Sequence, residues 1–377
     1  MRQAEALGAP VGAARPAGPG ARRRVPRSSV WAALGTALAF LLLLAYMRAS
    51  GQGILLAIRA GAKGPSAAVI SRDFPGVVLP DDTGLDGQQF YTIARDPFHP
   101  KAVAPSLGAP RYRYSRPLYP ALAWLLHPSG GGPGLVWAMI AVSLGGVFVG
   151  ALAIGALSDS LRGPPWLAAL YPLLPGTVWA LTTSVADALA VSLSLLTVVA
   201  VLRNRSGLAV LAAVAAALTR ETTILVPLAL VLARRRKADV PLLVLPAVAL
   251  GAWLAVVHVA VPAGGGAPEH LVLPFTGLVQ ALRSRWLHGH ELVGMGSTVS
   301  AVVVGAFVLA RRRGPSELRW VVAVQMAFLA VCSARVLGND FGGTRSTLTL
   351  LAVAIVVLVS GTRGREAPSS IAPTTTS

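Results

Sequence analysis

Ten apolar runs constrain this sequence more than any other feature. They cover residues 30–47, 134–157, 165–181, 185–202, 207–219, 222–233, 240–261, 294–310, 318–336 and 346–360. Only 13% of the 377 residues are charged, whereas soluble domains carry about 25%. One soluble core cannot bury this much apolar sequence. We therefore expect an all-α integral membrane protein with about ten transmembrane or membrane-embedded helices.

The basic residues indicate how these helices are oriented. Lysine and arginine collect in cytoplasmic loops. With the N-terminal tail in the cytoplasm, alternation of the ten runs brings every tight basic cluster of a short loop to that same side. These clusters lie at residues 162, 203–205, 234–237, 311–313 and 363–365. Both termini are therefore predicted to be cytoplasmic.

Composition and charge also indicate the expected partners and the cellular location. The net charge of +18 is explained by topology, because the basic residues flank apolar runs, so membrane lipids and not nucleic acid are the expected partners. Arginine is strongly preferred over lysine, and Ala, Gly and Pro are abundant. This bias is typical of a GC-rich bacterial genome, and the predicted location is the plasma (inner) membrane of a bacterium.

Two tails and one large loop lie outside the apolar runs. Residues 1–29 are rich in Arg, Pro, Gly and Ala without an apolar period and are expected to be a disordered cytoplasmic tail. Residues 363–377 are interpreted in the same way. The membrane domain between them covers residues 30–362. It includes a large extracytoplasmic loop at residues 48–116, which is predicted to contain short interfacial helices.

Two of the predicted hairpins are short. The runs 207–219 and 222–233 each give roughly 18 Å of helix, against a hydrocarbon core of ~30 Å. Either they form a short hairpin with a polar break at residues 218–222, or one long helix crosses 207–233 and puts the basic cluster 234–237 outside. We favour the hairpin. The break at residues 182–187 is similar, and both are expected to form the floor of an outward-opening cavity.

The most polar part of the large loop is LDGQQFYTIARDPF, at residues 85–98. A helix is expected over residues 83–96, ended by Pro97, which lacks an amide donor. Thr83 and Asp86 have the spacing of a capping box. Asp86 is therefore either a helix cap or a functional carboxylate.

Cations and aromatic residues alternate in RYRYSR, at residues 111–116. Aromatic faces can stack on sugars, and guanidinium forks pair with phosphate. The alternative is an interfacial belt, in which Tyr and Arg lie at the level of the lipid headgroups. In the predicted topology ten of the fifteen acidic residues face outward, which favours an outward-facing site.

Several of these segments resemble known proteins. The stretch DGQQFYTIA at residues 86–94, followed by PLYP at 117–120, resembles the first outer loop of the GPI mannosyltransferase family. The wider segment 86–98 also resembles related bacterial membrane proteins of the GT-C glycosyltransferase class. Residues 218–222 and 340–345 are similar to a polar break and a closing outer loop in such proteins. This chain departs from the family pattern in having Leu85 where the family has Trp, and in lacking an Asp-x-Asp pair.

The resemblance implies a GT-C-like fold and a glycosyltransferase. Such an enzyme moves a sugar from a polyprenyl-phosphate donor to an envelope glycan, lipid or protein acceptor at the extracytoplasmic face. Asp86 is the candidate base that deprotonates the acceptor hydroxyl, and Asp82 is the second candidate. The candidates for binding donor or acceptor are Tyr91, Arg95, Asp96, Arg113, Arg116, Tyr119, Asp187, Arg220, Glu221 and Arg345.

Two further features of the candidate site concern charge. Arg220 and Glu221 are neighbours in the polar break, and we expect them to pair with each other. The metal requirement stays open, and a divalent metal ion is one option.

Two other functions stay open. One is a transporter or lipid flippase, although intramembrane charges and inverted repeats, which often mark transporters, are not evident. The other is a non-catalytic scaffold for envelope assembly, which would not need the acidic residues gathered on the outer side. A Gly-rich nucleotide loop is absent from the sequence.

Overall fold

The computed structural model describes residues 26–265, 271–284 and 291–360. Within these ranges the secondary structure is helical, and the one β-type pairing is an isolated bridge between Leu271 and Cys332. The all-α prediction is thus confirmed for the described residues. Most of the two predicted tails lies outside these ranges. The first helix begins at Arg27, so residues 27–29 are helical and the predicted tail boundary at residue 29 is wrong.

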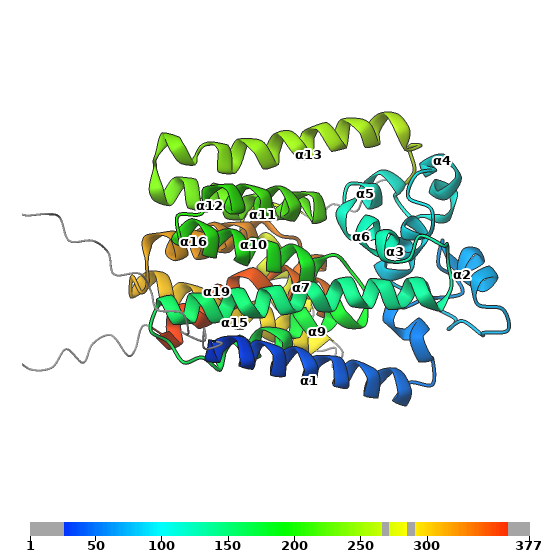
Figure 1. Ribbon diagram of the computed structural model, residues 1–377, viewed down its shortest axis with the longest axis horizontal. Coiled ribbons are helices and arrows are strands. Elements are labelled where there is room, and N and C mark those ends of the chain that lie inside the picture. Colours follow the sequence, from blue (N-terminus) through cyan, green and yellow to red (C-terminus); the bar gives the residue numbers. More distant parts are fainter. Residues whose placement is uncertain (1–25, 266–270, 285–290, 361–377) are drawn as a thin grey trace, which may run out of the picture.

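Four helices among the described residues are long and apolar enough to cross a membrane. They are α1 (Arg27–Ala49), α7 (Pro133–Ser160), the stretch Lys237–Ala260 that contains η5 (Lys237–Asp239) and α13 (Pro241–Ala260), and α15 (Leu292–Ala310). The long helices run side by side as a bundle (Figure 1). The structure supports membrane character, while the count of ten embedded helices remains a prediction.

Shorter helices complete the bundle. They are α8 (Leu167–Leu170), η3 (Tyr171–Leu173), α9 (Pro175–Thr182), α10 (Asp187–Leu202), α11 (Ser206–Thr219), η4 (Glu221–Ile224), α12 (Leu225–Arg234), α14 (Thr276–Ser284), α16 (Ser316–Val331), α17 (Ala334–Leu337), α18 (Asp340–Ser346) and α19 (Leu348–Ser360). Helices α11 and α12 are separated by η4 and by Arg220, whose backbone is extended at φ −158° and ψ 126°. The predicted short hairpin is confirmed, and a single helix across 207–233 is wrong.

Residues 50–132 form a layer over one end of the bundle, which we call the cap (Figure 1). The cap is built from η1 (Gly53–Ile58), α2 (Ala67–Asp73), α3 (Asp86–Arg95), α4 (Pro100–Val103), η2 (Ala104–Ser106), α5 (Pro110–Tyr114) and α6 (Leu118–Leu126). It contains the large loop predicted from the sequence, together with α6 and the turn that leads into α7.

Helix α3 begins at Asp86, three residues later than predicted. Its N-cap residue is Leu85, and no side chain caps the helix, so the predicted capping box is wrong. The carboxylate of Asp82 instead accepts a hydrogen bond from the amide of Gly84, at 2.8 Å, in a local turn. Residues 87–94 are all buried, and Asp86 is partly exposed. The side chain of Asp86 therefore lies at the start of a helix whose following residues are packed inside the protein.

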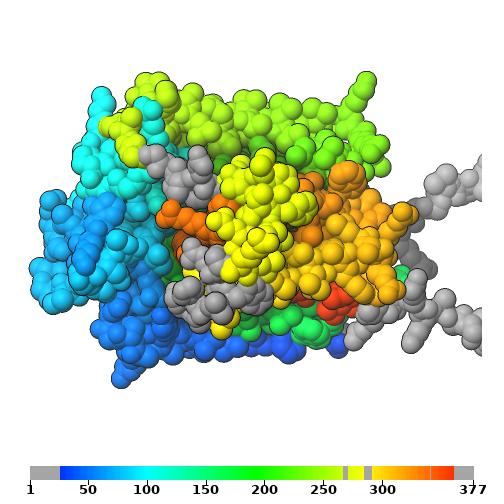
Figure 2. Space-filling view, turned by 180° about the vertical axis from the view of Figure 1, so that it is seen from behind, coloured from blue at the N-terminus to red at the C-terminus, as the bar shows by residue number. Residues whose placement is uncertain are grey.

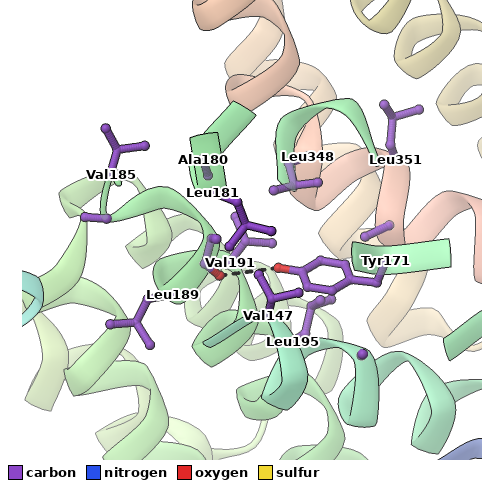
Figure 3. Close-up of a cluster of buried hydrophobic side chains, with 14 of the residues drawn as sticks. Val147, Tyr171, Ala180, Leu181, Val185, Leu189, Val191, Leu195, Leu348 and Leu351 are labelled. Carbon is purple, nitrogen blue, oxygen red and sulfur yellow. Dashed lines mark hydrogen bonds between the residues drawn. The ribbon is translucent and has the colours of Figure 1, made fainter. Parts of the chain in front are cut away.

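Buried side chains fill the centre of the bundle where α7, α9, α10 and α19 meet (Figure 3). Val147, Leu195 and Leu348 are fully buried there. Tyr171 lies in the same cluster, and its hydroxyl is 2.9 Å from the hydroxyl of Ser192, which satisfies the polar atom in an apolar environment. This core holds α9 and α10 in place, and with them the polar segment that joins the two helices below the cap.

Candidate functional site

Seven charged side chains meet where the cap contacts the bundle. They are Asp86, Arg113, Arg116, Asp187, Arg220, Glu221 and Arg345. We call this set the arginine cluster. Four arginines against three acids give it a net charge of +1. It unites seven of the twelve site residues predicted from the sequence, drawn from the cap, α10, the α11–α12 break and α18.

Asp86 connects the cap to α18. One carboxylate oxygen is 2.8 Å from Nη1 of Arg113, and the other is 3.7 Å from Nη1 of Arg345. Burial alone would raise the pKa of this carboxyl group, but Arg113, Arg345 and Arg116 more than offset that effect and hold its pKa below the ordinary value. Asp86 is therefore an ionised carboxylate at neutral pH, and 19% of its side chain remains exposed.

Asp187 is the most deeply buried acid of the cluster. It is the first residue of α10, only 1% of its side chain is exposed, and its two oxygens contact Arg220 and Arg345. A buried carboxylate needs such partners, because an uncompensated charge in a low-dielectric interior is costly. The predicted pairing of Arg220 with Glu221 is therefore wrong, since the carboxylate that Arg220 contacts is that of Asp187.

Glu221 has a different partner. Its two carboxylate oxygens lie 3.0 Å from Nε and 2.7 Å from Nη2 of Arg116, a bidentate pair. Nη2 of Arg116 also donates to the hydroxyl of Tyr112 at 2.6 Å, and the guanidinium lies 4.5 Å from the centre of that ring. Arg116 is buried in this network, so the interpretation of residues 111–116 as an interfacial belt is wrong for Arg116. Arg113 is partly buried and pairs with Asp86.

Two glycines let the elements around the cluster approach closely. A Cβ atom on Gly87 would collide with the carbonyl oxygen of Thr183, and one on Gly176 would collide with that of Thr344. The first contact seats the start of α3 on the segment before α10, and the second seats α9 on α18. The close approach at these two glycines was not predicted from the sequence. The sequence feature that could have indicated the first contact is the position of Gly87 directly after Asp86.

Two aromatic side chains support the cluster: Phe341, which was not predicted, and Tyr112, which was predicted only as part of the alternating run at residues 111–116. The guanidinium of Arg345 lies 3.9 Å from the centre of the Phe341 ring, and Tyr112 supports Arg116 as described above. Aromatic faces stabilise guanidinium groups while leaving their N–H groups free to bind anions. From the back of the molecule, the orange segment that contains α17 and α18 reaches the surface between the cap and α14 (Figure 2).

Three predicted site residues make their contacts within the cap. Tyr91 and Arg95 both bind one oxygen of Asp73, at 2.7 and 2.8 Å. Asp96 pairs with His99 at 2.7 Å. These contacts tie α2, α3 and the start of α4 together, so the three side chains hold the cap and do not reach the arginine cluster.

The other two predicted residues are also separate from the cluster. Tyr119 is fully buried, and its hydroxyl lies 3.0 Å from that of Ser143, which fixes α6 to α7. Asp82 is exposed in its turn. In the described ranges no group of three or more His, Cys, Asp or Glu side chains is arranged to hold a metal ion.

Comparison with known proteins adds no assignment. The chain matches no family model, no curated protein and no solved structure. We therefore infer the function from the motifs and from the geometry of the arginine cluster.

Proposed function

We propose that this chain is a membrane glycosyltransferase, which transfers a sugar from a polyprenyl-phosphate donor to an envelope glycan, lipid or protein acceptor at the extracytoplasmic face. The observation that supports this most directly is the position of Asp86. This ionised carboxylate, the candidate base, lies where the cap meets the bundle, and the guanidinium groups of Arg113, Arg345 and Arg116 act on it.

The charge of the cluster supports binding of an anionic donor. Four arginines exceed the three acids by one charge, and guanidinium forks match phosphate oxygens. Asp86 is the acid that the arginines hold most loosely, because Glu221 is held by a bidentate pair and Asp187 is enclosed by two arginines. In this proposal the donor phosphate takes over Arg113 and Arg345, and loss of these partners raises the pKa of Asp86 toward that of a useful base.

The reaction then needs one proton transfer and one displacement. Asp86 accepts the proton of the acceptor hydroxyl while that oxygen attacks the anomeric carbon of the sugar. The bond between the anomeric carbon and the phosphate oxygen breaks, and polyprenyl phosphate leaves with the electron pair. The arginines stabilise the charge that develops on the departing phosphate.

The same proposal assigns an orientation. The connections α10–α11, α12–α13 and α15–α16 lie at the end of the bundle away from the cap (Figure 1), and they carry basic residues at 203–205, 234–237 and 311–313. By the positive-inside rule that end is cytoplasmic. The cap is then extracytoplasmic and both termini are cytoplasmic, in the inner membrane of a bacterium.

Transfer of labelled sugar tests the proposal. Membranes with and without the protein are incubated with a panel of labelled polyprenyl-phosphate hexoses, and products are separated by thin-layer chromatography. Asp86→Asn keeps the shape of the side chain but cannot act as a base, so transfer should fall by about 10²-fold or more. Asp81→Asn is the matched control, because Asp81 is exposed and pairs with Lys63 outside the cluster.

Two results would contradict the proposal. One is near-normal transfer by Asp86→Asn at normal protein amount. The other is the absence of any protein-dependent labelled product across the panel of donors.

A further inference from the structure

An apolar groove lies between α1 and α9, apart from the arginine cluster. It has a volume of about 350 Å³, within the range of small-molecule sites. Its walls are largely apolar, formed by Ala39, Leu42, Leu43, Val178 and Leu181. Beside it α1 exposes Leu34, Leu38 and Leu41. The groove is thus continuous with an apolar helix surface of the kind that a bilayer covers.

Arg59 closes the groove at the cap end. Its guanidinium lies 5.5 Å from the ring centre of Tyr46 and 5.9 Å from that of Trp179, and it donates to the Tyr46 hydroxyl at 2.7 Å. Across the described ranges no carboxylate pairs with Arg59, and its Nε atom is buried without a hydrogen-bond partner. A cation in this setting is stabilised by an anion that accepts its remaining N–H groups.

The backbone at Arg59 is fixed. Its φ of 49° lies in the left-handed region, and its carbonyl accepts the amide of Leu85 at 2.9 Å. A left-handed arginine backbone is uncommon and persists where the surroundings hold it. The arginine is therefore a built part of the groove and not a freely moving surface side chain.

We propose that the groove binds an acyl chain of a monoanionic phospholipid of the phosphatidylglycerol type, with the lipid phosphodiester on Arg59. The apolar walls suit the chain. From Ala39 to Tyr46 the groove follows eight residues of helix, or about 10 Å, so it takes part of one chain.

Charge selects this occupant. One arginine without a carboxylate partner matches the single negative charge of a phosphodiester. The two aromatic rings are already occupied by the guanidinium of Arg59, so no aromatic cage remains for the ammonium of a zwitterionic headgroup. An anionic headgroup without its own cation is the one that fits.

The bound lipid is expected to stabilise the junction between cap and bundle. Trp179 meets the Phe341 ring edge-on with centres 6.5 Å apart, and Arg345 of the arginine cluster lies over that same ring. Arg59 itself holds Leu85, the residue before Asp86. Lipid in the groove therefore braces both α9 and the start of α3. This inference does not depend on the proposed transferase activity.

Native mass spectrometry of the full-length protein in detergent tests the site. Phosphatidylglycerol and phosphatidylcholine with identical acyl chains are titrated separately, and the wild type should prefer the anionic lipid. Arg59→Gln removes the charge and should weaken phosphatidylglycerol binding about tenfold, or about 1.4 kcal/mol. Arg59→Lys should restore part of the preference. Arg72→Gln is the matched control, because Arg72 is an exposed cap arginine remote from the groove lining.

A second variant keeps the test independent of the arginine. Leu42→Trp puts bulk into the groove from a half-exposed position and should weaken phosphatidylglycerol binding while leaving Arg59 intact. The proposal is overturned if Arg59→Gln and Leu42→Trp both bind phosphatidylglycerol as the wild type does, or if the wild type shows no preference over phosphatidylcholine. Tighter binding of polyprenyl phosphate than of phosphatidylglycerol, lost in Arg59→Gln, would also overturn it and assign the groove to that lipid.

Discussion

Replacing Asp187 tests whether the arginine cluster holds the cap on the bundle. Asp187→Asn keeps the size of the side chain but raises the net charge of the cluster from +1 to +2. Arg345 retains Asp86 at 3.7 Å, whereas Arg220 loses the carboxylate that it contacts. Because Asp187 is 1% exposed and Arg220 18% exposed, breaking this buried pair should cost about 3–5 kcal/mol.

The assay is a thermal scan of detergent-purified protein, followed by the fluorescence of its eight tryptophans. For large domains about 1 kcal/mol moves Tm by about 2 °C, so Asp187→Asn should lower Tm by roughly 6–10 °C. Adding Arg220→Gln removes the stranded cation and returns the cluster to +1. The double variant should therefore melt above Asp187→Asn alone.

A second double variant is the control. Arg220 and Glu221 are adjacent in sequence, but the structure gives them different partners, Asp187 and Arg116. Arg220→Gln with Glu221→Gln should thus show no rescue, and the effects of the two single changes should add. The reasoning is refuted if Asp187→Asn with Arg220→Gln is as unstable as the sum of its singles, or if the rescue appears in the Arg220–Glu221 pair instead.

Three further predictions concern the candidate base, the start of α3 and the orientation. Burial would raise the pKa of Asp86, but the arginines lower it overall, so its ion pairs stabilise the fold above the unfolded pKa of about 3.9 and are lost as the pH falls through the lower folded pKa. In melting scans from pH 7 to pH 3, Tm should therefore fall with acid, and it should fall less in Asp86→Asn. An equal fall in both proteins would contradict this. Gly87→Ala should cost about 1–3 kcal/mol by overpacking against the Thr183 carbonyl, seen as a lower Tm, and an unchanged Tm would show that α3 does not pack this closely. A cysteine at Ser106 should react with an impermeant thiol reagent added to intact cells, whereas one at Gly314 should not; labelling at Gly314 would reverse the orientation.

The apolar runs and their breaks could be read from the sequence. Helices α1, α7, α13 and α15 coincide with predicted runs within a few residues, because the length and hydropathy of a helix are properties of one continuous segment. The break at Arg220 was predictable for the same reason, since each flanking run was short. The residue at which α3 begins could not be predicted from the sequence. Thr83 and Asp86 have the spacing of a capping box, yet the backbone turns at Asp82 and delays the helix to Asp86.

Which charges pair was decided only by the tertiary structure. The extended backbone at Arg220 sends neighbouring side chains in different directions, so Arg220 meets Asp187 while Glu221 meets Arg116. Arg95 likewise pairs with Asp73 within the cap. Its nearness to Asp86 in the sequence had predicted that it belongs to the candidate site. The sequence identified which residues were able to carry charge chemistry. Their partners come from α10, the hairpin break, α18 and the cap, and only the packing of these elements brings them within reach of one another.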